Sequence, residues 1–206
     1  MSYYFIGATR FDDYEGMLKY FAGIMPLFAE HRAELIVQGP CEATLEGDFP
    51  ITSAVVARFA DRQAALGWYE SGGCQKLKVF RTSIGASNAW LAVPSDPATG
   101  AQPAIQPGGE YRYFLGVTRI ADPGRLQAYG ARIKSTVHEL GGTMVLEARC
   151  ESQPEGSVPA DNVMVIRFNS AADANRWHQS PQYAALRASR TEYAQTALWM
   201  MQRAAA

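Results

Sequence analysis

The chain has 206 residues, of which 48% are hydrophobic and 19% charged, as in a folded globular protein. The formal net charge is −1 and there is no run of Lys or Arg, so neither nucleic acid nor an anionic membrane is an expected partner. There is also no secretory signal and no apolar stretch near the ~18 residues that a membrane span requires, so we expect a cytoplasmic protein.

In the first half of the chain, β-rich apolar runs alternate with segments of helical character. In chain order the pattern predicts a strand at 3–11, a helix from Asp13 to about His31, strands at 34–38 and 54–59, a helix from Asp61 and a strand at 88–93. Aspartate is a good N-cap, which supports both helix starts. Ser71-Gly72-Gly73 follows the second helix and predicts that this helix is broken or loose there.

Residues 94–110 contain four prolines without apolar periodicity, which predicts a semi-extended linker. Beyond it the same order recurs, with strands at 112–120, 143–147, 163–168 and 197–201, helices from Asp122 and Ser170, and a helical restart at Ser180-Pro181. We therefore predict a first domain at residues 1–93, the linker at 94–110 and a second domain at 111–206.

The two halves are copies of one another. At a constant offset of 109 residues, Tyr4-Phe5-Ile6-Gly7 aligns with Tyr113-Phe114-Leu115-Gly116, and the match runs without a gap to Trp90 and Trp199. A period of this length is the size of a small domain, so the sequence predicts a duplicated domain. Each copy has the order β-α-β-β-α-β, which is that of a ferredoxin-like unit.

The predicted strands are apolar on both faces. On the first strand Tyr4 and Ile6 point one way while Phe5 and Phe11 point the other. A ferredoxin-like unit has helices on one face only, and a sheet with its other face in water should alternate apolar with polar residues. We therefore predict an α+β protein whose two antiparallel sheets pack face to face, as a pseudo-dimeric α+β barrel within one chain.

The cysteines and histidines show no metal-binding pattern. Cys41, Cys74 and Cys150 are odd in number and widely spaced, which is typical of reduced thiols in a cytoplasmic protein. The sequence has no C-x-x-C or H-x-x-x-H spacing, so no metal site is expected.

Arg167-Phe168-Asn-Ser opens a segment that continues through Trp177-His178 to Ser180-Pro181-Gln-Tyr183. It resembles a small family of unknown function in the dimeric α+β barrel superfamily, whose pattern reads E-F-x-S-x-x-x-A-x-x-W-Y-x-S-P-x-Y-x-x-L. The loop at 45–50 is similar to that family's L-E-G-D-W-P. The chain departs from the pattern at Gly72-Gly73-Cys74 (P-x-Y in the family) and at Ser157-Val158 (an Asp-aromatic pair). Each copy has lost part of what the other keeps, so two equivalent active sites are not expected.

The resemblance carries several implications. Family members normally have one domain and form homodimers, so this chain resembles a fused dimer, and a further homodimer is an expectation. The superfamily implies a pocket in each half, between sheet and helices, for small aromatic, quinone-like or lactone substrates. Its members include cofactor-free monooxygenases, lactone isomerases, polyketide cyclases and haem-binding proteins. No cofactor is expected here. A haem would need a histidine ligand that faces the pocket, and the sequence gives only a weak signal for one, so haem binding is the open alternative.

Four arginines near strand ends are candidates for binding a carboxylate or enolate. They are Arg10, Arg58, Arg119 and Arg167. By strand parity they share the face of Tyr4 and Tyr113, and a guanidinium there can hold an anion through two hydrogen bonds. The alternative is that each extends to the surface and pairs with an acid. Trp177 and Trp199 are candidates for the wall of a pocket, with burial in the core as the alternative.

For proton transfer we single out His178, Tyr113 and Glu155. His178 lies beside Trp177, and imidazole has an ordinary pKa suited to proton transfer near neutrality. Its counterpart in the first copy is a tyrosine, which fits either one active copy or drift at an exposed helix end. Glu155, like its counterpart Glu46, is a candidate general base, with structural pairing to an arginine as the alternative.

Three functions remain open on the sequence. The first is an enzyme of the isomerase, cyclase or monooxygenase type that works without a cofactor. Its substrate is a small hydrophobic or aromatic molecule, and the four arginines allow for an anionic one. The second is a non-catalytic small-molecule-binding protein that uses the same pocket. The third is a structural module, which predicts no cavity large enough for a ligand.

Overall fold

The computed structural model describes residues 1–95 and 109–202. Most of the expected linker at 94–110 therefore lies outside the described residues. The elements, in chain order, are β1 (Tyr3–Phe11), α1 (Tyr14–Glu30), β2 (Glu34–Glu46), β3 (Ser53–Phe59), α2 (Arg62–Tyr69), α3 (Gly72–Ser83), β4 (Gly85–Pro94), β5 (Arg112–Ile120), α4 (Pro123–Glu139), β6 (Thr143–Glu155), β7 (Asn162–Phe168), α5 (Ala171–His178), α6 (Pro181–Arg190) and β8 (Ala194–Gln202).

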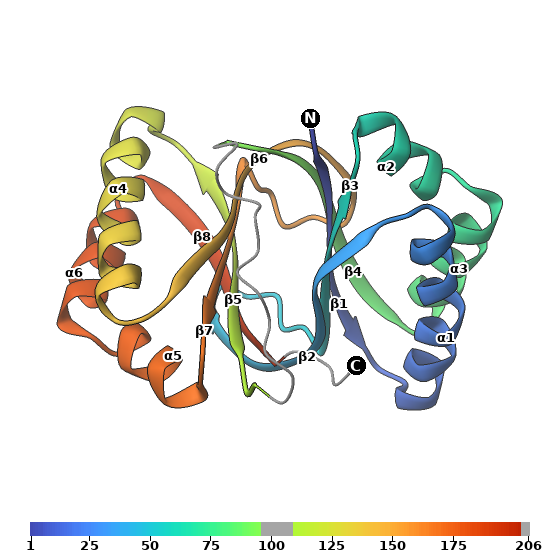
Figure 1. Ribbon diagram of the computed structural model, residues 1–206, viewed down its shortest axis with the longest axis horizontal. Helices are drawn as coiled ribbons and strands as arrows, with labels where there is room; N and C mark the ends of the chain where they lie inside the picture. The colour runs from blue at the N-terminus through green and yellow to red at the C-terminus, as the bar shows by residue number, and fades with distance from the viewer. Residues whose placement is uncertain (96–108, 203–206) are drawn as a thin grey trace.

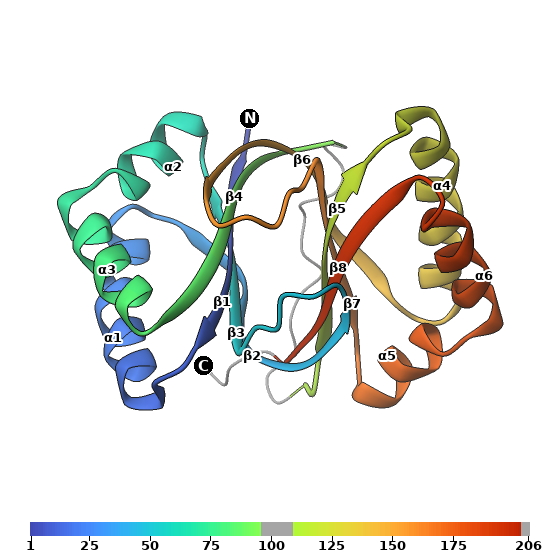
Figure 2. The same cartoon turned by 180° about the vertical axis from the view of Figure 1, so that it is seen from behind.

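The strands form one closed antiparallel barrel, in the order β1-β3-β2-β8-β5-β7-β6-β4. The predicted α+β class and antiparallel pairing are confirmed. The sequence predicted two antiparallel sheets packed face to face as a barrel within one chain. In the structure the hydrogen-bonded pairs β2–β8 and β4–β6 also join the halves at both edges, so the eight strands form one continuous sheet. The helices of each half cover the outside of its own strands, so the molecule has a helical layer at either end of its long axis (Figures 1 and 2).

The edges close because β2 and β6 are much longer than the sequence suggested. Each has 13 residues, of which the sequence predicted only the first few. The remaining part of β2 pairs Cys41 with Met201, and that of β6 pairs Cys150 with Ala92, with register shifts in both ladders. Pro40 and the alternation of polar with apolar residues concealed these extensions, because proline removes a ladder hydrogen bond and is confined to edges and bulges.

Three hydrophobic clusters fill the molecule. One lies inside the barrel and combines residues of both halves, such as Ile6 and Val56 with Leu115 and Val165. The others lie between the strands and the helices of the first half and of the second half. Alternate strand residues serve different clusters, so the prediction that both faces of the strands are buried is confirmed.

The predicted break at Ser71-Gly72-Gly73 is confirmed, because α2 ends at Tyr69 and a separate helix, α3, begins at Gly72 as α6 begins after Ser180. The helix that restarts there is well formed rather than loose. The Ser71 hydroxyl accepts a hydrogen bond from the backbone N–H of Cys74 at 3.2 Å, which caps the helix. A Cβ at position 73 would lie 3.0 Å from Leu27 Cδ1, so the glycine lets α3 approach α1 closely. The serine cap and this packing outweigh the low helix propensity of two glycines.

We expect Leu146→Ala to lower the free energy of unfolding by about 2–5 kcal/mol, because Leu146 is fully buried in the cluster that both halves share. Urea unfolding followed by far-UV circular dichroism measures this change. The transition should stay single, since each half loses its inner core when the other unfolds. Leu18→Ala, at a position 50% exposed on α1, is the control and should change little. Two separate transitions would contradict a shared core.

Candidate functional site

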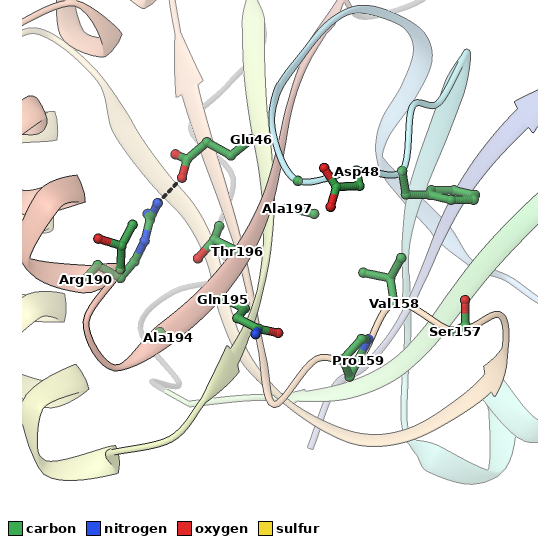
Figure 3. A pocket seen from close by; sticks show the side chains of 13 residues that line it. Glu46, Asp48, Ser157, Val158, Pro159, Arg190, Ala194, Gln195, Thr196 and Ala197 are labelled. Carbon is green, nitrogen blue, oxygen red and sulfur yellow. Dashed lines mark hydrogen bonds and ion pairs between the residues drawn. The ribbon is translucent and has the colours of Figure 1, made fainter.

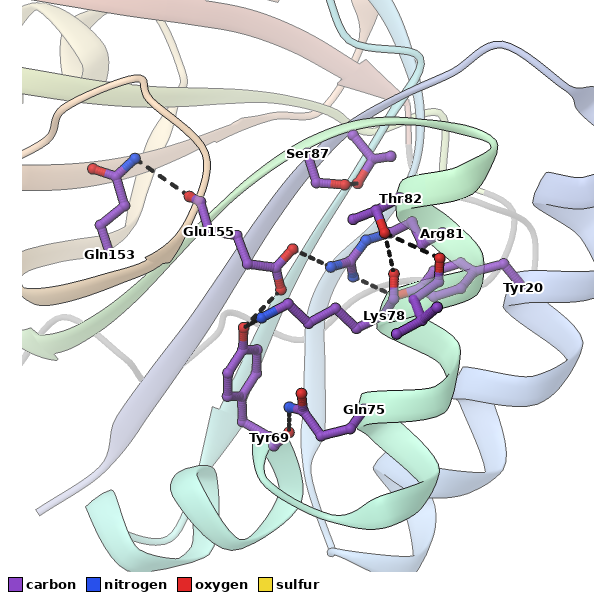
Figure 4. A network of polar contacts seen from close by, with 11 residues as sticks. Tyr20, Tyr69, Gln75, Lys78, Arg81, Thr82, Ser87, Gln153 and Glu155 are labelled. Carbon is purple, nitrogen blue, oxygen red and sulfur yellow. Dashed lines mark hydrogen bonds and ion pairs between the residues drawn. The ribbon is translucent and has the colours of Figure 1, made fainter.

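Two clusters of polar side chains link the halves reciprocally. Glu155, at the end of β6, enters the helical layer of the first half (Figure 4). Its Oε1 accepts a hydrogen bond from the Tyr69 hydroxyl at 2.9 Å, and its Oε2 forms an ion pair with Arg81 of α3. Arg81 also donates to the Tyr20 hydroxyl at 2.8 Å, and Lys78 donates to the Tyr69 hydroxyl at 2.8 Å.

Glu46, at the end of β2, makes the corresponding contacts in the second half. Its Oε1 accepts from the Tyr183 hydroxyl at 2.8 Å, and its Oε2 forms an ion pair with Arg190 at the end of α6 (Figure 3). Arg190 also donates to the Tyr129 hydroxyl at 2.9 Å. Each glutamate therefore binds the helices of the other copy, and the long second strand of each copy is what carries it there.

A glycine follows each glutamate and has a positive φ, +85° at Gly47 and +81° at Gly156. Glycine adopts this conformation without steric penalty, so the chain turns sharply just after the glutamate. Space is also limited, because a Cβ at position 47 would lie 3.0 Å from the Cβ of Ala197. In both copies the glycine of the Glu-Gly pair thus ends the strand, and the glutamate before it directs its carboxylate toward the other half.

Both ion pairs are well shielded from water. The exposed side-chain fractions are 7% and 5% for Arg81 and Glu155, and 2% and 13% for Arg190 and Glu46. Burial raises the pKa of Tyr69, and the charge of Glu155 adds to this effect. The pKa of Tyr183 is likewise raised, chiefly by burial. Both tyrosines therefore keep their protons at neutral pH and act as hydrogen-bond donors.

The two donor tyrosines come from different positions of the repeat. Tyr69 ends α2, and its counterpart in the second copy is His178. Tyr183 lies in the first turn of α6, and its counterpart in the first copy is Cys74. Each copy thus keeps one of the two tyrosines in the motif, and either one reaches the glutamate from the opposite half.

A cavity of about 730 Å³ borders the Glu46 cluster (Figure 3). Its lining comes from the loops after β2 and β6, the end of α6 and the start of β8: Glu46, Gly47, Asp48, Phe49, Ser157, Val158, Pro159, Arg190, Thr191, Ala194, Gln195, Thr196 and Ala197. A neighbouring cavity of about 520 Å³ shares Pro159, Thr191, Ala194 and Gln195 with it and extends to Arg119. Both halves therefore contribute to one composite site.

The three residues expected to move protons are not brought together. Tyr113 is fully buried in the cluster inside the barrel, whereas Glu155 lies in the helical layer of the first half. His178 lies on the outer side of the second half, with its ring 5.9 Å from Phe114 and 5.5 Å from Tyr183. Its Nε2 is buried and has no hydrogen-bond partner within the described residues. Of the three, His178 is the one near the Glu46 cluster.

The arginines expected to bind an anion lie mostly outside the cavity. Arg10 pairs with Asp12 at 3.1 Å and Arg119 with Asp161 at 3.5 Å. Arg58 pairs with Glu34, whereas Arg167 lies 4.9 Å from the centre of the Tyr111 ring. Only Arg119 borders one of the two adjoining cavities. Three of these four arginines therefore form ion pairs with a nearby acid, which is the alternative to binding an anionic ligand.

The two tryptophans are core residues in the structure. Trp177 is fully buried and packs against Tyr183 with 4.2 Å between ring centres. Trp199 is fully buried inside the barrel, and its Nε1 donates to the carbonyl oxygen of Phe49 at 3.0 Å. This hydrogen bond positions the cavity loop, although neither tryptophan lines the cavity itself.

Sequence reasoning missed Arg190 and Tyr183 as functional residues. The Arg-Thr pair that ends both helices recurs at the constant offset, at Arg81 and Arg190. An arginine repeated at the end of a helix, with a repeated Glu-Gly elsewhere, is the signal that could have linked them. The sequence makes both Glu46 and Glu155 candidate general bases, but it does not reveal which of the two borders a cavity.

The residues present do not fit a haem or a metal site. A haem iron requires an axial ligand, commonly a histidine, that faces a cavity. His178 packs against aromatic rings, and none of the three histidines lines a cavity described above. In the described part of the chain, no group of three His, Cys, Asp or Glu side chains could hold a metal ion. Burial raises the pKa of Cys41 to about 11, so this thiol is not an activated nucleophile.

Among the described helices, none has the length and apolar character needed to cross a bilayer.

Comparisons with known proteins concern the family and the fold. A family described as "Domain of unknown function (DUF1330)" matches residues 2–93 and again residues 112–204. No curated protein matches the sequence. An anthrone oxidase-like protein of known structure has a TM-score of 0.64 at 11% identity, covering 97% of this chain and 91% of its own.

Two further solved structures share the architecture. A candidate monooxygenase from Lactobacillus acidophilus has a TM-score of 0.57 at 10% identity, over 100% of this chain and 98% of its own. A chlorite dismutase variant from Candidatus Nitrospira defluvii has a TM-score of 0.54 at 10% identity, over 97% and 91% respectively. At such identities the likeness shows the fold alone.

The stability of the protein should depend on the protonation of His178. Burial, and then the charge of Arg187, lower the pKa of His178 below its ordinary value of 6.5. Between pH 6.5 and the lower folded-state pKa, the unfolded chain therefore binds a proton at His178 that the folded chain does not. The free energy of unfolding should be fully retained above that pH and decrease as the pH falls through the folded-state pKa.

His178→Phe keeps the aromatic packing and removes the titrating group. We expect urea unfolding between pH 7 and 5 to show a shallower pH dependence for this variant than for the wild type. His138→Phe, at an exposed position on α4, is the matched control. Identical pH profiles for the wild type and His178→Phe would contradict the assignment.

Proposed function

The chain belongs to the DUF1330 family of the dimeric α+β barrel type, with two copies of that domain in one polypeptide, and we propose that it is an enzyme acting by proton transfer at the Glu46 cavity. We interpret residues 1–93 and 111–206 as two ferredoxin-like lobes connected by a linker at 94–110. The anthrone oxidase-like and monooxygenase-like neighbours are compatible with an enzymatic role.

The observation that carries the proposal is a carboxylate in the wall of the larger cavity, fixed by two donors. Glu46 is held by the Tyr183 hydroxyl and by Arg190, so its orientation is set before a ligand enters. Preorganised groups at a reacting centre need no rearrangement during the reaction. Glu46 is the residue that we assign to accept and return a proton.

Isomerisation needs only the groups that line the cavity. The carboxylate of Glu46 takes a proton from a carbon beside a carbonyl. The electron pair of the broken C–H bond moves toward the carbonyl oxygen, and the substrate becomes an enolate. The resulting carboxyl group then returns the same proton to a different carbon of the substrate. No electrons pass to a second reactant, so the step balances with side chains alone. Cyclisation through the same enolate is the closest variant.

The charges of the cavity favour a neutral substrate over the anionic one that the sequence suggested. The positive charge of Arg190 is already matched by Glu46. Asp48 is exposed, lines the cavity and has no ion pair within the described residues. A lactone, quinone or other neutral ring with hydrogen-bonding oxygens fits this balance, with Gln195 and Thr196 as donors at the rim.

We assign His178 a positioning role, because it contacts the Tyr183 ring and does not line the cavity. Its lowered pKa keeps the imidazole neutral near pH 7, so it adds no charge behind the Glu46 pair. Tyr113 and Glu155 have no part in this site. The further homodimer expected from the family remains a prediction.

The alternative function is binding without chemistry. One observation favours it: both oxygens of Glu46 already accept hydrogen bonds, which is also how a purely structural carboxylate is held. A binder retains affinity for its ligand in Glu46→Asp or Glu46→Gln to the extent that the cavity survives. An enzyme loses turnover in both, whatever the affinity.

The two equivalent glutamates provide a matched test. We expect Glu46→Gln and Glu155→Gln each to lower the free energy of unfolding, by up to about 3–5 kcal/mol, because each leaves a buried arginine without its counter-charge. The wild type and both variants are then screened by thermal shift with two neutral compounds, γ-butyrolactone and 2,3-dimethyl-1,4-naphthoquinone, and with benzoate as the anionic comparison. A ligand that binds only the folded state raises the Tm.

Only Glu46→Gln should lose the ligand-induced rise in Tm, because Glu155 does not line the cavity. Gln195→Trp is a further variant that fills the cavity without touching either ion pair, and it should lose the rise with its own Tm unchanged. If Glu155→Gln abolishes the rise and Gln195→Trp does not, the ligand binds elsewhere and the proposal is wrong.

A further inference from the structure

The Glu155 cluster has the same parts as the Glu46 cluster, but neither of the two cavities described above borders it. At the constant offset, the residues that correspond to Ala194–Ala197 are Gly85–Asn88, and Arg81 corresponds to Arg190. None of the cavities described above is lined by Glu155 or Arg81. The two clusters have equivalent residues, so a local difference between the copies must explain why the Glu46 cluster borders a cavity and the Glu155 cluster does not.

The loop after β6 is held to β4 at two points. The Asn88 Oδ1 accepts a hydrogen bond from the backbone N–H of Val158 at 2.8 Å, and Trp90 Nε1 donates to the carbonyl oxygen of Val158 at 3.1 Å. Asn88 is only 1% exposed, so its side chain is enclosed beneath that loop. The hydrogen bonds thus fix both peptide groups of one residue against the strand.

The loop after β2 keeps only one of these two attachments. Trp199 Nε1 donates to the carbonyl oxygen of Phe49, as Trp90 does to that of Val158. The counterpart of Asn88 is Ala197, whose methyl group can neither accept nor donate a hydrogen bond. Ala197 lines the open cavity, at the position where the longer amide of Asn88 occupies the other site.

The glycine turns differ in the same sense. A Cβ at Gly156 would lie 2.1 Å from Asn88 Oδ1, whereas one at Gly47 would lie 3.0 Å from the Ala197 Cβ. The turn after Glu155 is therefore packed more closely against its strand than the turn after Glu46. The two glutamates differ accordingly: the exposed side-chain fraction is 5% for Glu155 and 13% for Glu46.

We propose that the Glu155–Arg81 cluster is a second ligand site of the same kind, closed by Asn88, and that the residue at positions 88 and 197 decides which site is open. The proposal rests on the proposed function, in that the Glu46 cavity binds a small neutral ring compound. It predicts one ligand per chain in the wild type, although the chain contains two copies of the site.

The test uses two reciprocal variants of the full-length chain. Asn88→Ala should release the loop at Val158 and open a second cavity, and Ala197→Asn should close the first. The amide exchange rate of Val158 should rise at least about fivefold in Asn88→Ala, because its hydrogen-bond acceptor is removed. Ser87→Ala, on the neighbouring residue of β4, is the matched control and should leave that rate unchanged.

Crystal structures of both variants decide the closure independently of any ligand. A cavity beside Glu155 in Asn88→Ala supports the proposal, and a loop that stays packed on β4 overturns it. Calorimetric titration with γ-butyrolactone and 2,3-dimethyl-1,4-naphthoquinone then counts sites: one in the wild type, two in Asn88→Ala and none in Ala197→Asn. One site in an Asn88→Ala protein with an open second cavity would refute a second ligand site. Failure of both compounds to bind the wild type would count against the proposed function, while the crystal structures would still decide the closure.

Discussion

The structure depends on one constraint: each four-stranded sheet has two apolar faces, and its own helices cover only one of them. The hydrophobic effect therefore requires a second sheet, and the duplicated copy supplies it. The shared cluster inside the barrel combines both halves, and the strand edges join through β2–β8 and β4–β6. Closure removes the open edges, which otherwise are sites of aggregation. The long second strands that complete the barrel also carry Glu46 and Glu155 across it.

Hydrophobic packing alone does not specify how the two halves are oriented, and the buried ion pairs supply this specificity. Removing Arg190 and Glu46 from water is unfavourable, and it is offset only when their charges meet with correct geometry. Each pair joins a strand end of one copy to a helix end of the other, so it forms only in the native arrangement of the two halves. The pairs therefore favour this docking over other ways of burying the same apolar surface. One of them has the further property of bordering a cavity.

Duplication within one chain lets two equivalent sites diverge. In a homodimer every substitution appears at both sites, whereas here positions 88 and 197 hold different residues. The same independence explains why the first copy keeps Tyr69 but has Cys74, while the second keeps Tyr183 but has His178. Either tyrosine satisfies the glutamate opposite, so each cluster needs only one. A single functional site with a closed counterpart is the outcome that this independence permits.

The sequence alone determined the duplication, the α+β class, the burial of both strand faces and the absence of a metal pattern, because these follow from local periodicity and residue type. It also indicated that the copies are not equivalent, through the motif positions that each has lost. Only the tertiary structure decided that β2 and β6 continue past Pro40 and Pro154, since those extensions are stabilised by pairing with the other copy. It likewise joined Glu46 to Arg190, which are 144 residues apart, and placed Tyr113 on the opposite face from His178. Contacts between distant segments depend on how the two halves dock, and no local pattern encodes that geometry.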